Sequence, residues 1–398
     1  MALFQTIDDK SECIAVYINN KLVFNKIPKT NLSTTWDYSV FLKDIEEVEY
    51  AKLFCEGKSL DQACPKHLET EWLPVFNKLK AFYRSAREAQ LDLNKYCFYE
   101  LIPEHFIIEY CVIKNKITNY IFKNYKRPVN YNFLVSLTKL VTDIKYKKLN
   151  IDLSELKTQR HKLEVRNFIQ KINKIEPHIK YNIFGTKTGR LSTIKNSFPA
   201  LTMNKNYRSV LKPQNDLFIE FDYNAAELRV MLALLDKEQP QEDLHEWNLK
   251  HVYRGVGTRE KAKKRIFAWL YNPESKDYLS SRSYDRDLLL QKYWDGTHVR
   301  TIYDRKIEAD KHHALNYIIQ STFADLFLRQ AIKVHELLKN KKSFISLLIH
   351  DSLVIDFSES EKNILPELKK ILMDTKLGKF KISSSAGKDF GSMERFNI

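Results

Sequence analysis

The chain has 398 residues and a formal net charge of +15 at pH 7. Because single hydrophobic cores stop growing near roughly 250–300 residues, we expect at least two subdomains. The excess of lysine and arginine favours a polyanionic partner such as nucleic acid, and the hydrophobic content of 43% excludes a disordered basic tail. No stretch reaches the roughly 18 uninterrupted apolar residues of a membrane span, so we expect no membrane partner and a cytoplasmic location.

The positions of the cysteines and glycines indicate the redox state of the thiols and the place where the backbone is most free. The five cysteines have no Cys-x-x-Cys spacing and all precede residue 112, so we expect buried, reduced thiols. These cysteines are Cys13, Cys55, Cys64, Cys97 and Cys111. Of only nine glycines, two lie in the short run from Gly185 to Gly189, which indicates that backbone freedom is concentrated there.

The first 180 residues predict a small α/β element followed by helices. Residues 13–24 indicate two short strands around an Asn19-Asn20 turn. From about 45 to 180 the pattern is mostly helical, and lysines crowd the polar faces. Solvated helix faces and contacts with a nucleic-acid duplex both explain these lysines, and the sequence leaves the two open. The clearest helical repeat is formed by Val165, Phe168, Ile169, Ile172 and Ile175.

After residue 180, two strand-like segments end near aspartates. The run 217–221 leads into Asp222, and a helical pattern follows over 225–235. The runs 344–349 and 353–357 flank a turn that carries Asp351, which predicts a hairpin. Taken alone, two such aspartates are weak evidence because turn aspartates are common. In a basic protein they suggest two Mg²⁺ ions, about 4 Å apart, that stabilise the attacking and leaving oxygens of a phosphoryl transfer.

A helix between the two aspartates strengthens this interpretation. Two strongly helical blocks cover about 258–271 and 309–335, and in the first of them four residues recur every four positions. They are Arg259, Lys263, Phe267 and Tyr271. At 3.6 residues per turn they form one stripe, in which the cations can hold phosphate oxygens and the aromatic rings can stack on a base. The stripe is therefore suited to a nucleoside triphosphate.

From about residue 180 to 398 the chain resembles the polymerase domain of family A DNA polymerases, the bacterial DNA polymerase I group. Five motifs occur in the family's order, which is strong evidence although each alone is moderate. The segment Thr188–Ser192 resembles TGRLS, and Asp222–Arg229 resembles the first metal motif, DYSQIELR. The stripe matches the nucleotide-binding helix. Asn316–Asp325 resembles NxPxQGTAAD, and Ile349–Ser352 resembles the second metal motif, VHDE.

The resemblance implies an α+β, right-hand polymerase with an antiparallel-sheet palm, helical fingers and a helical thumb, in addition to the small N-terminal α/β element. The expected regions are a cap or reduced exonuclease remnant over 1–85, thumb over 86–180, palm over 181–235 and 326–398, and fingers over 236–325. The compact form resembles a bacteriophage replicase, and we find no Asp-x-Glu followed by the other carboxylates of a proofreading exonuclease.

The resemblance also implies the roles of individual residues. Asp222 and Asp351 are the expected catalytic residues and hold two Mg²⁺ ions, for which Mn²⁺ can substitute, together with the Tyr223 carbonyl. The expected nucleotide-binding residues are Arg259, Lys263, Phe267, Tyr271, His245 and Glu227. The expected DNA-binding residues are Arg190, Thr188, Asn316, Gln320 and His350. The implied partners are primer–template DNA and deoxynucleoside triphosphates, and we expect a monomer.

Three positions depart from the family's pattern. Asn272 stands in place of a glycine after the stripe, Ser352 in place of the glutamate of VHDE, and His312 in place of a common arginine. The interval from Tyr271 to Asn316 is shorter than in familiar cellular members of the family, so we expect a smaller fingers region. Both metal aspartates and the full stripe remain, which favours retained catalysis.

Two alternatives compete with a DNA polymerase. A single-subunit phage-type RNA polymerase often carries His-Asp-Ser at its second metal motif, as this chain does, but it has glycine where this chain has Glu227, and it is far larger. A catalytically silent module that binds primer–template junctions would keep the basic residues but would not need both aspartates.

Overall fold

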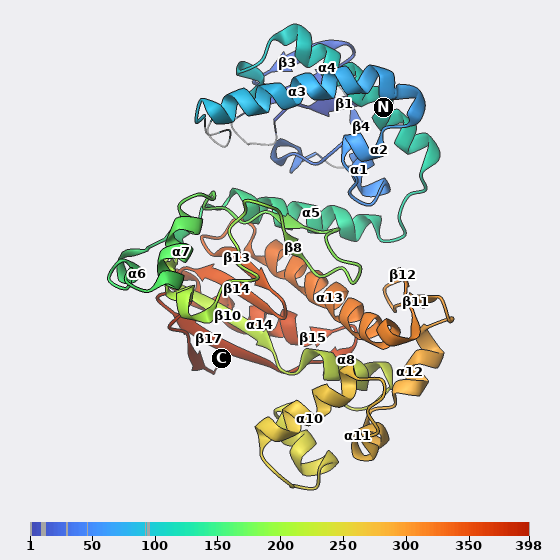
Figure 1. The fold of residues 1–398 in the computed structure, drawn as a ribbon, viewed down its shortest axis with the longest axis vertical. Coiled ribbons are helices and arrows are strands. Elements are labelled where there is room, and N and C mark those ends of the chain that lie inside the picture. Colours follow the sequence, from blue (N-terminus) through green and yellow to red (C-terminus); the bar gives the residue numbers. More distant parts are fainter. Residues whose placement is uncertain are drawn as a thin grey trace. The chain divides into compact units, whose positions relative to one another are not determined.

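The computed structural model describes residues 2–8, 13–28, 31–45, 47–91, 93 and 96–397. The chain forms two compact units, Met1–Lys139 and Leu140–Ile398, which are shown in Figure 1. Among the described residues, no helix combines the length and the apolar character needed to cross a membrane.

The first unit contains a mixed sheet with the strand order β3-β2-β1-β4-β5. β1 pairs antiparallel with β2 and parallel with β4. The predicted hairpin is confirmed, because β2 and β3 pair on either side of Asn19 and Asn20, which both have the positive φ of a tight turn. The strands are β1 (Ala2–Thr6), β2 (Ala15–Ile18), β3 (Lys21–Phe24), β4 (Leu32–Thr35) and β5 (Glu49–Tyr50).

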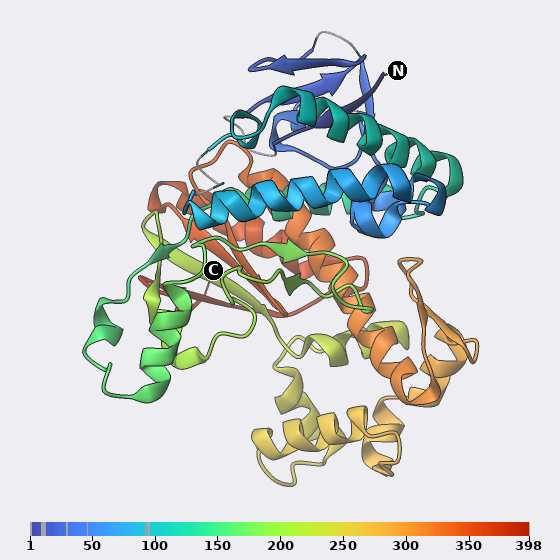
Figure 2. The ribbon, with the colours of Figure 1, turned by 45° about the horizontal axis from the view of Figure 1, so that its top comes forward.

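Most helices of the first unit follow its strands, as the sequence predicts, and the longer ones are seen in blue and teal in Figure 2. The helices are α1 (Ala51–Phe54), α2 (Leu60–Ala63), α3 (Glu69–Glu88), α4 (Glu104–Asn124) and α5 (Tyr131–Tyr146), with the short 3-10 helices η1 (Val40–Leu42), η2 (Lys66–Leu68) and η3 (Phe98–Glu100). α4 packs on β1 through buried polar contacts: Gln5 donates to Thr118 and to Asn115, at 3.0 Å each. The Lys114 ammonium donates to the Thr6 carbonyl.

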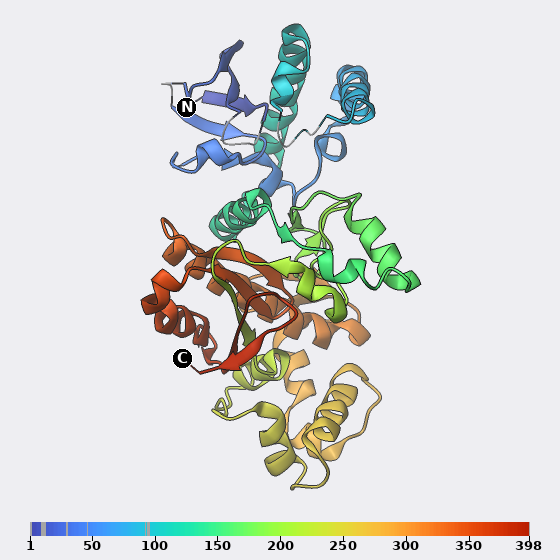
Figure 3. The ribbon, with the colours of Figure 1, turned by 90° about the vertical axis from the view of Figure 1, so that its left-hand side faces the viewer.

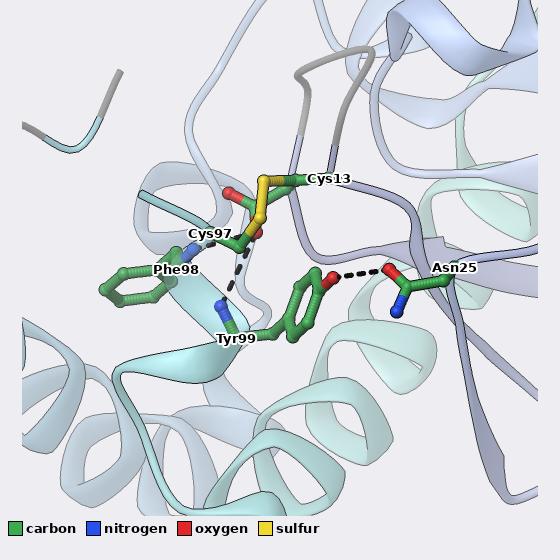
Figure 4. The surroundings of a disulfide bond; sticks show 6 residues. Cys13, Asn25, Cys97, Phe98 and Tyr99 are labelled. Atoms are coloured by element: carbon green, nitrogen blue, oxygen red, sulfur yellow. Dashed lines mark hydrogen bonds between the residues drawn. A yellow bond between two sulfur atoms is a disulfide. The ribbon is translucent and has the colours of Figure 1, made fainter. Parts of the chain in front are cut away.

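The expectation that all cysteines are reduced is wrong at two positions. Cys13 and Cys97 form a disulfide, whereas Cys55, Cys64 and Cys111 are free (Figure 4). The pair is 84 residues apart in sequence and therefore has no recognisable spacing. Tertiary contacts bring the two segments together: the Asp8 carboxylate accepts a hydrogen bond from the Phe98 amide next to Cys97.

The second unit contains an antiparallel sheet with the strand order β13-β14-β10-β17-β18, which confirms the predicted palm architecture. Its strands are β10 (Leu217–Tyr223), β13 (Phe344–Ile349), β14 (Ser352–Phe357), β17 (Ile382–Gly387) and β18 (Glu394–Phe396). Short paired strands elsewhere in this unit are β6 (Asn150–Ile151), β7 (Tyr181–Asn182), β8 (Ser192–Thr193), β9 (Leu211–Lys212), β11 (His298–Arg300), β12 (Lys306–Glu308), β15 (Asp374–Thr375) and β16 (Gly378–Lys379).

Helix α13 (Lys311–Leu338) covers one face of this sheet (Figures 1 and 3). The buried Tyr223 ring of β10 contacts Phe323 and Phe327 of α13, which places the apolar core between sheet and helix. The other helices are α6 (Ser154–Lys157), α7 (Leu163–Ile172), α8 (Ala226–Leu234), α9 (Leu244–Trp247), α10 (Arg259–Tyr271), α11 (Tyr278–Ser283), α12 (Arg286–Tyr293) and α14 (Leu365–Met373), with η4 (Lys205–Val210), the π-helix η5 (Asn248–Val252) and η6 (Glu359–Ile364).

Two of the expected region limits fall inside helices. Position 85 lies within α3, position 325 lies within α13, and the two compact units divide within α5. Helix α4, which we expected in the thumb, belongs to the first compact unit. The assignment of thumb and fingers stays a prediction.

Candidate active site

Asp222 lies near the end of β10, on the sheet face opposite α13. Side chains alternate along a strand, so Phe221 and Tyr223 point into the core while Asp222 and Glu220 point to the other face. The register places Ser352 of β14 and Ser383 of β17 beside Asp222. The palm therefore presents a half-buried carboxylate among small polar residues.

A buried arginine holds the turn that follows β10. Ala225 has the left-handed φ of +50°, which is unfavourable for a residue with a Cβ. The fully buried Arg229 donates from Nε to the Asn224 carbonyl at 2.8 Å and from Nη2 to Asn224 Oδ1 at 3.1 Å. It also donates to the Pro240 and Glu242 carbonyls. This network fixes the direction in which α8 leaves the strand.

Asp351 lies in the tight turn between β13 and β14, as the sequence predicts. Its carbonyl accepts a hydrogen bond from the Tyr223 amide at 3.2 Å, so the two metal motifs are joined through their backbones. The preceding residue, His350, has a φ of +50° and its Nε2 lies 3.2 Å from the Leu201 carbonyl oxygen. Strand pairing thus brings together the two aspartates, which are distant in sequence.

Burial and neighbouring carboxylates destabilise the ionised forms of both aspartates. Burial, together with the nearby charges of Asp351 and Glu220, raises the pKa of Asp222 to about 7, while Arg395 and Lys263 oppose the rise. Burial also raises the pKa of Asp351. A divalent cation would relieve this repulsion, and Mg²⁺ prefers few protein carboxylates. The described residues contain no cluster of three or more His, Cys, Asp or Glu suited to a metal, so a site here would rest on two aspartates and a carbonyl.

The predicted stripe lies on α10. The Arg259 guanidinium forms a fork with the Asp243 carboxylate, with Nη2 and Oδ2 2.9 Å apart and Nε and Oδ1 3.1 Å apart. The Phe267 ring contacts both His245, at 5.7 Å between ring centroids, and Tyr271, at 5.9 Å. Burial lowers the pKa of His245 to about 4, so at neutral pH this side chain is a neutral hydrogen-bonding group rather than a third cation.

Glu227 links α10 to the glycine-containing run. Its carboxylate accepts hydrogen bonds from Arg190 Nη2 at 2.7 Å and from the Tyr271 hydroxyl. Gln320 of α13 also interacts with the Tyr271 hydroxyl. Burial and the Glu227 charge raise the pKa of Tyr271, which therefore stays a hydrogen-bond donor. Three sequence-predicted segments thus meet at one carboxylate.

The remaining predicted DNA-binding residues have different surroundings. Thr188 is a buried residue of the run itself, and Arg190 and His350 line the same small hollow. In α13, the Asn316 Oδ1 atom is buried and has no hydrogen-bond partner among the described residues. A buried amide oxygen without a partner is costly, which is consistent with a ligand group supplied from outside the chain.

Several supporting residues were not predicted as site residues. Arg229 holds the turn after β10, and Asp243 holds the Arg259 side chain. Arg305 contacts Gly189. Asp243 was visible in the sequence only through its place two residues before His245. Arg305 carries no local signal, because its partners are distant in sequence.

Known proteins resemble this chain at moderate similarity. DNA polymerase I of Borreliella burgdorferi is 23% identical over 265 residues, and DNA polymerase I of Caldicellulosiruptor bescii is 27% identical over 251 residues. These matches cover 52% and 50% of this chain but only 29% of each relative, so the chain matches less than a third of their length. No family model matches the chain.

The structural comparison identifies the fold. A solved structure described as the POL domain of Pol1 from M. smegmatis in complex with DNA primer-template and dNTP has a TM-score of 0.59 and 13% sequence identity, and the match covers 72% of this chain and 76% of that one. The fold is therefore that of a polymerase domain. Together with the two DNA polymerase I relatives, it confirms the predicted resemblance to family A DNA polymerases.

Proposed function

We propose that the chain is a template-directed DNA polymerase that extends a primer 3′ end with deoxynucleoside triphosphates. The observation that supports this best is the joining of Asp222 and Asp351 through strand pairing on the face of the palm sheet opposite α13. The proposal includes the thumb, palm and fingers regions, action as a monomer in the cytoplasm, and a bacteriophage origin.

The proposed metal ligands are Asp222, Asp351 and the Tyr223 carbonyl. When bound, two Mg²⁺ ions supply charge stabilisation for the attacking and leaving oxygens of an in-line displacement. The protein's own contribution is to keep the two carboxylates half-buried and close together. The Tyr223 side chain takes no part, because its hydroxyl donates to the Leu372 carbonyl in the core.

In the proposed nucleotide site, Arg259 and Lys263 hold triphosphate oxygens and Phe267 packs on the incoming base. The fork to Asp243 keeps the Arg259 guanidinium extended before a nucleotide arrives, which reduces the entropy lost on binding. His245, being neutral, would donate a hydrogen bond to a phosphate oxygen without adding charge. We propose that Glu227 and Tyr271, which are hydrogen-bonded to each other, meet the sugar of that nucleotide.

In the proposed DNA site, Arg190, Thr188, Asn316, Gln320 and His350 contact the primer–template near its terminus. Minor-groove acceptors are shared by all correct base pairs, so donors such as the Arg190 guanidinium test the shape of a pair without reading its sequence. The positive net charge supports binding through phosphate contacts that do not depend on sequence.

Primer extension by the purified chain with Mg²⁺ and four deoxynucleotides tests the proposal. Asp222→Asn and Asp351→Asn should each lower extension by at least about 100-fold while primer–template affinity changes little, because affinity arises from distributed phosphate contacts. Asp236→Asn is the matched control, since this aspartate follows α8 and is 85% exposed. Extension by either active-site variant at the wild-type rate would reject the metal assignment. A wild-type preference for ribonucleotides would favour the RNA polymerase alternative.

A further inference from the structure

A buried ion pair joins the β11–β12 hairpin to α13. Arg305 Nη2 lies 2.6 Å from Asp325 Oδ1, and Arg305 Nε lies 3.0 Å from Asp325 Oδ2, so the guanidinium and the carboxylate form a two-pronged fork. The Asp325 side chain is only 3% exposed. Because desolvation offsets much of the attraction in a buried pair, such a pair is weak evidence for a role in stability alone.

The same guanidinium lies flat against Gly189. A Cβ atom built on this glycine would lie 2.5 Å from Arg305 Nη2 and 2.6 Å from Cζ. Gly189 also has a φ of +77°, a conformation that side-chain-bearing residues rarely adopt. The position therefore requires glycine for two independent reasons. Asp325 prevents Arg305 from moving aside, because both of its interacting nitrogens are engaged.

The residue after Gly189 is Arg190, whose guanidinium donates to Glu227. Its carbonyl accepts a hydrogen bond from the Thr186 hydroxyl at 2.8 Å, which closes the run on itself. The peptide unit between Gly189 and Arg190 is planar, so the position of Gly189 against the Arg305 guanidinium also fixes the position of the Arg190 Cα atom. A shift of about 1 Å at such a point is enough to cost catalysis heavily.

We propose that Arg305, held by Asp325, is a positioning residue for Arg190, and through it a determinant of how the protein discriminates matched from mismatched primer ends. The inference rests on the proposed function, in which Arg190 reaches the minor groove of the terminal pair. Arg305 itself lies beneath the run, on the side of Gly189, and acts by fixing the backbone.

A double-mutant cycle tests whether Arg305 acts through Arg190. The measured quantity is the ratio of extension rates from matched and mismatched primer ends. Arg305→Met should lower this ratio about 10-fold in the wild-type background but less than about 2-fold in the Arg190→Ala background, because residues that act through one group are not additive. Arg300→Met, an exposed arginine on the same hairpin, is the control for lost charge and should leave the ratio unchanged. Equal reductions in both backgrounds would overturn the proposal.

A binding measurement separates this inference from the proposed function. Wild-type affinity should fall when the terminal primer purine lacks the N3 acceptor, and Arg305→Met should abolish that dependence even without catalysis. Failure of the wild type to extend any primer, with this dependence intact, would reject the proposed function alone. If Arg305→Met does not fold, Arg305→Lys is used instead, because it keeps the charge but not the two-pronged contact with Asp325. It should lower the matched-to-mismatched ratio by less than Arg305→Met, and again more in the wild-type than in the Arg190→Ala background. Normal discrimination in a folded Arg305→Lys variant would reject the inference.

Discussion

Both compact units carry polar side chains on a five-stranded sheet, but the two units differ in whether those side chains are satisfied by hydrogen bonds within the chain. In the first unit, Gln5 of β1 is fully buried and its amide is hydrogen-bonded to Thr118 and Asn115. In the second unit, Asp222 is half-buried beside carboxylates that raise its pKa. A buried polar group that is hydrogen-bonded within the chain stabilises the fold. Two carboxylates that repel each other at close range instead favour the binding of a cation. The comparison is the reason that we propose the chemistry for the second unit.

The largest expected effect is a loss of stability in the first unit, which tests whether that unit has a structural role. Cys13→Ser removes the disulfide that closes an 84-residue separation, and the free energy of unfolding of this unit should fall by about 4.5 kcal/mol according to the chain-entropy relation. Chemical denaturation followed by a probe in residues 1–139 measures the loss. Cys64→Ser changes a free cysteine of the same unit and should have little effect. A stability equal to that of wild type would show that the disulfide does not constrain this unit.

The next effect tests the second unit as the site of chemistry. Lys263→Ala should lower the rate of nucleotide addition about 100-fold, equivalent to roughly 2.7 kcal/mol, because a cation on the triphosphate stabilises charge that develops on the leaving pyrophosphate. Single-turnover extension and DNA affinity are measured in parallel. Lys264→Ala, one position along α10, is the matched control. Equal losses of rate and DNA affinity would place Lys263 on the DNA.

A smaller effect concerns selection of the sugar. Glu227→Ala should raise ribonucleotide use relative to deoxynucleotide use by about 10-fold, since the Glu227 carboxylate held by Tyr271 and Arg190 would no longer obstruct a 2′-hydroxyl. Competition between the two nucleotide types measures the ratio directly. Tyr278→Ala alters an exposed residue outside this cluster and serves as the control. An unchanged ratio in Glu227→Ala would leave the carboxylate with a structural role only.

An effect of about the same size is the pH dependence that His245 gives to the stability of the second unit. Because burial lowers the pKa of His245 from 6.5 to about 4, the unfolded chain binds this proton more readily, and the contribution of the neutral imidazole to stability is lost as pH falls from about 6.5 toward 4. Between pH 7 and 5 the loss should be about 1–2 kcal/mol. Thermal unfolding should show that the stability difference between wild type and His245→Asn changes by this amount over the range, whereas the difference between wild type and the exposed His312→Asn stays constant. Parallel pH profiles in all three proteins would contradict a buried neutral imidazole.

Much of the second unit was predictable because its signals are local. The four-residue repeat of Arg259, Lys263, Phe267 and Tyr271 lies within one helix, and the strands that end near Asp222 and Asp351 are marked by short apolar runs. The first unit was less predictable: its hairpin was identified from Asn19 and Asn20, but the pairing of β1 with β4 was not.

The sequence by itself determined the helix and strand periods, the order of the motifs and the residue types at the candidate site, because each depends on neighbours within a few positions. Only the tertiary structure decided that Cys13 meets Cys97, that α4 packs on β1, and that Arg305 lies beneath Gly189. These contacts join segments that are 84 or more residues apart, so they depend on how the folded chain closes and on which polar groups become buried. The raised pKa of Asp222 has the same origin, since a carboxylate in the sequence has no burial until the sheet forms around it.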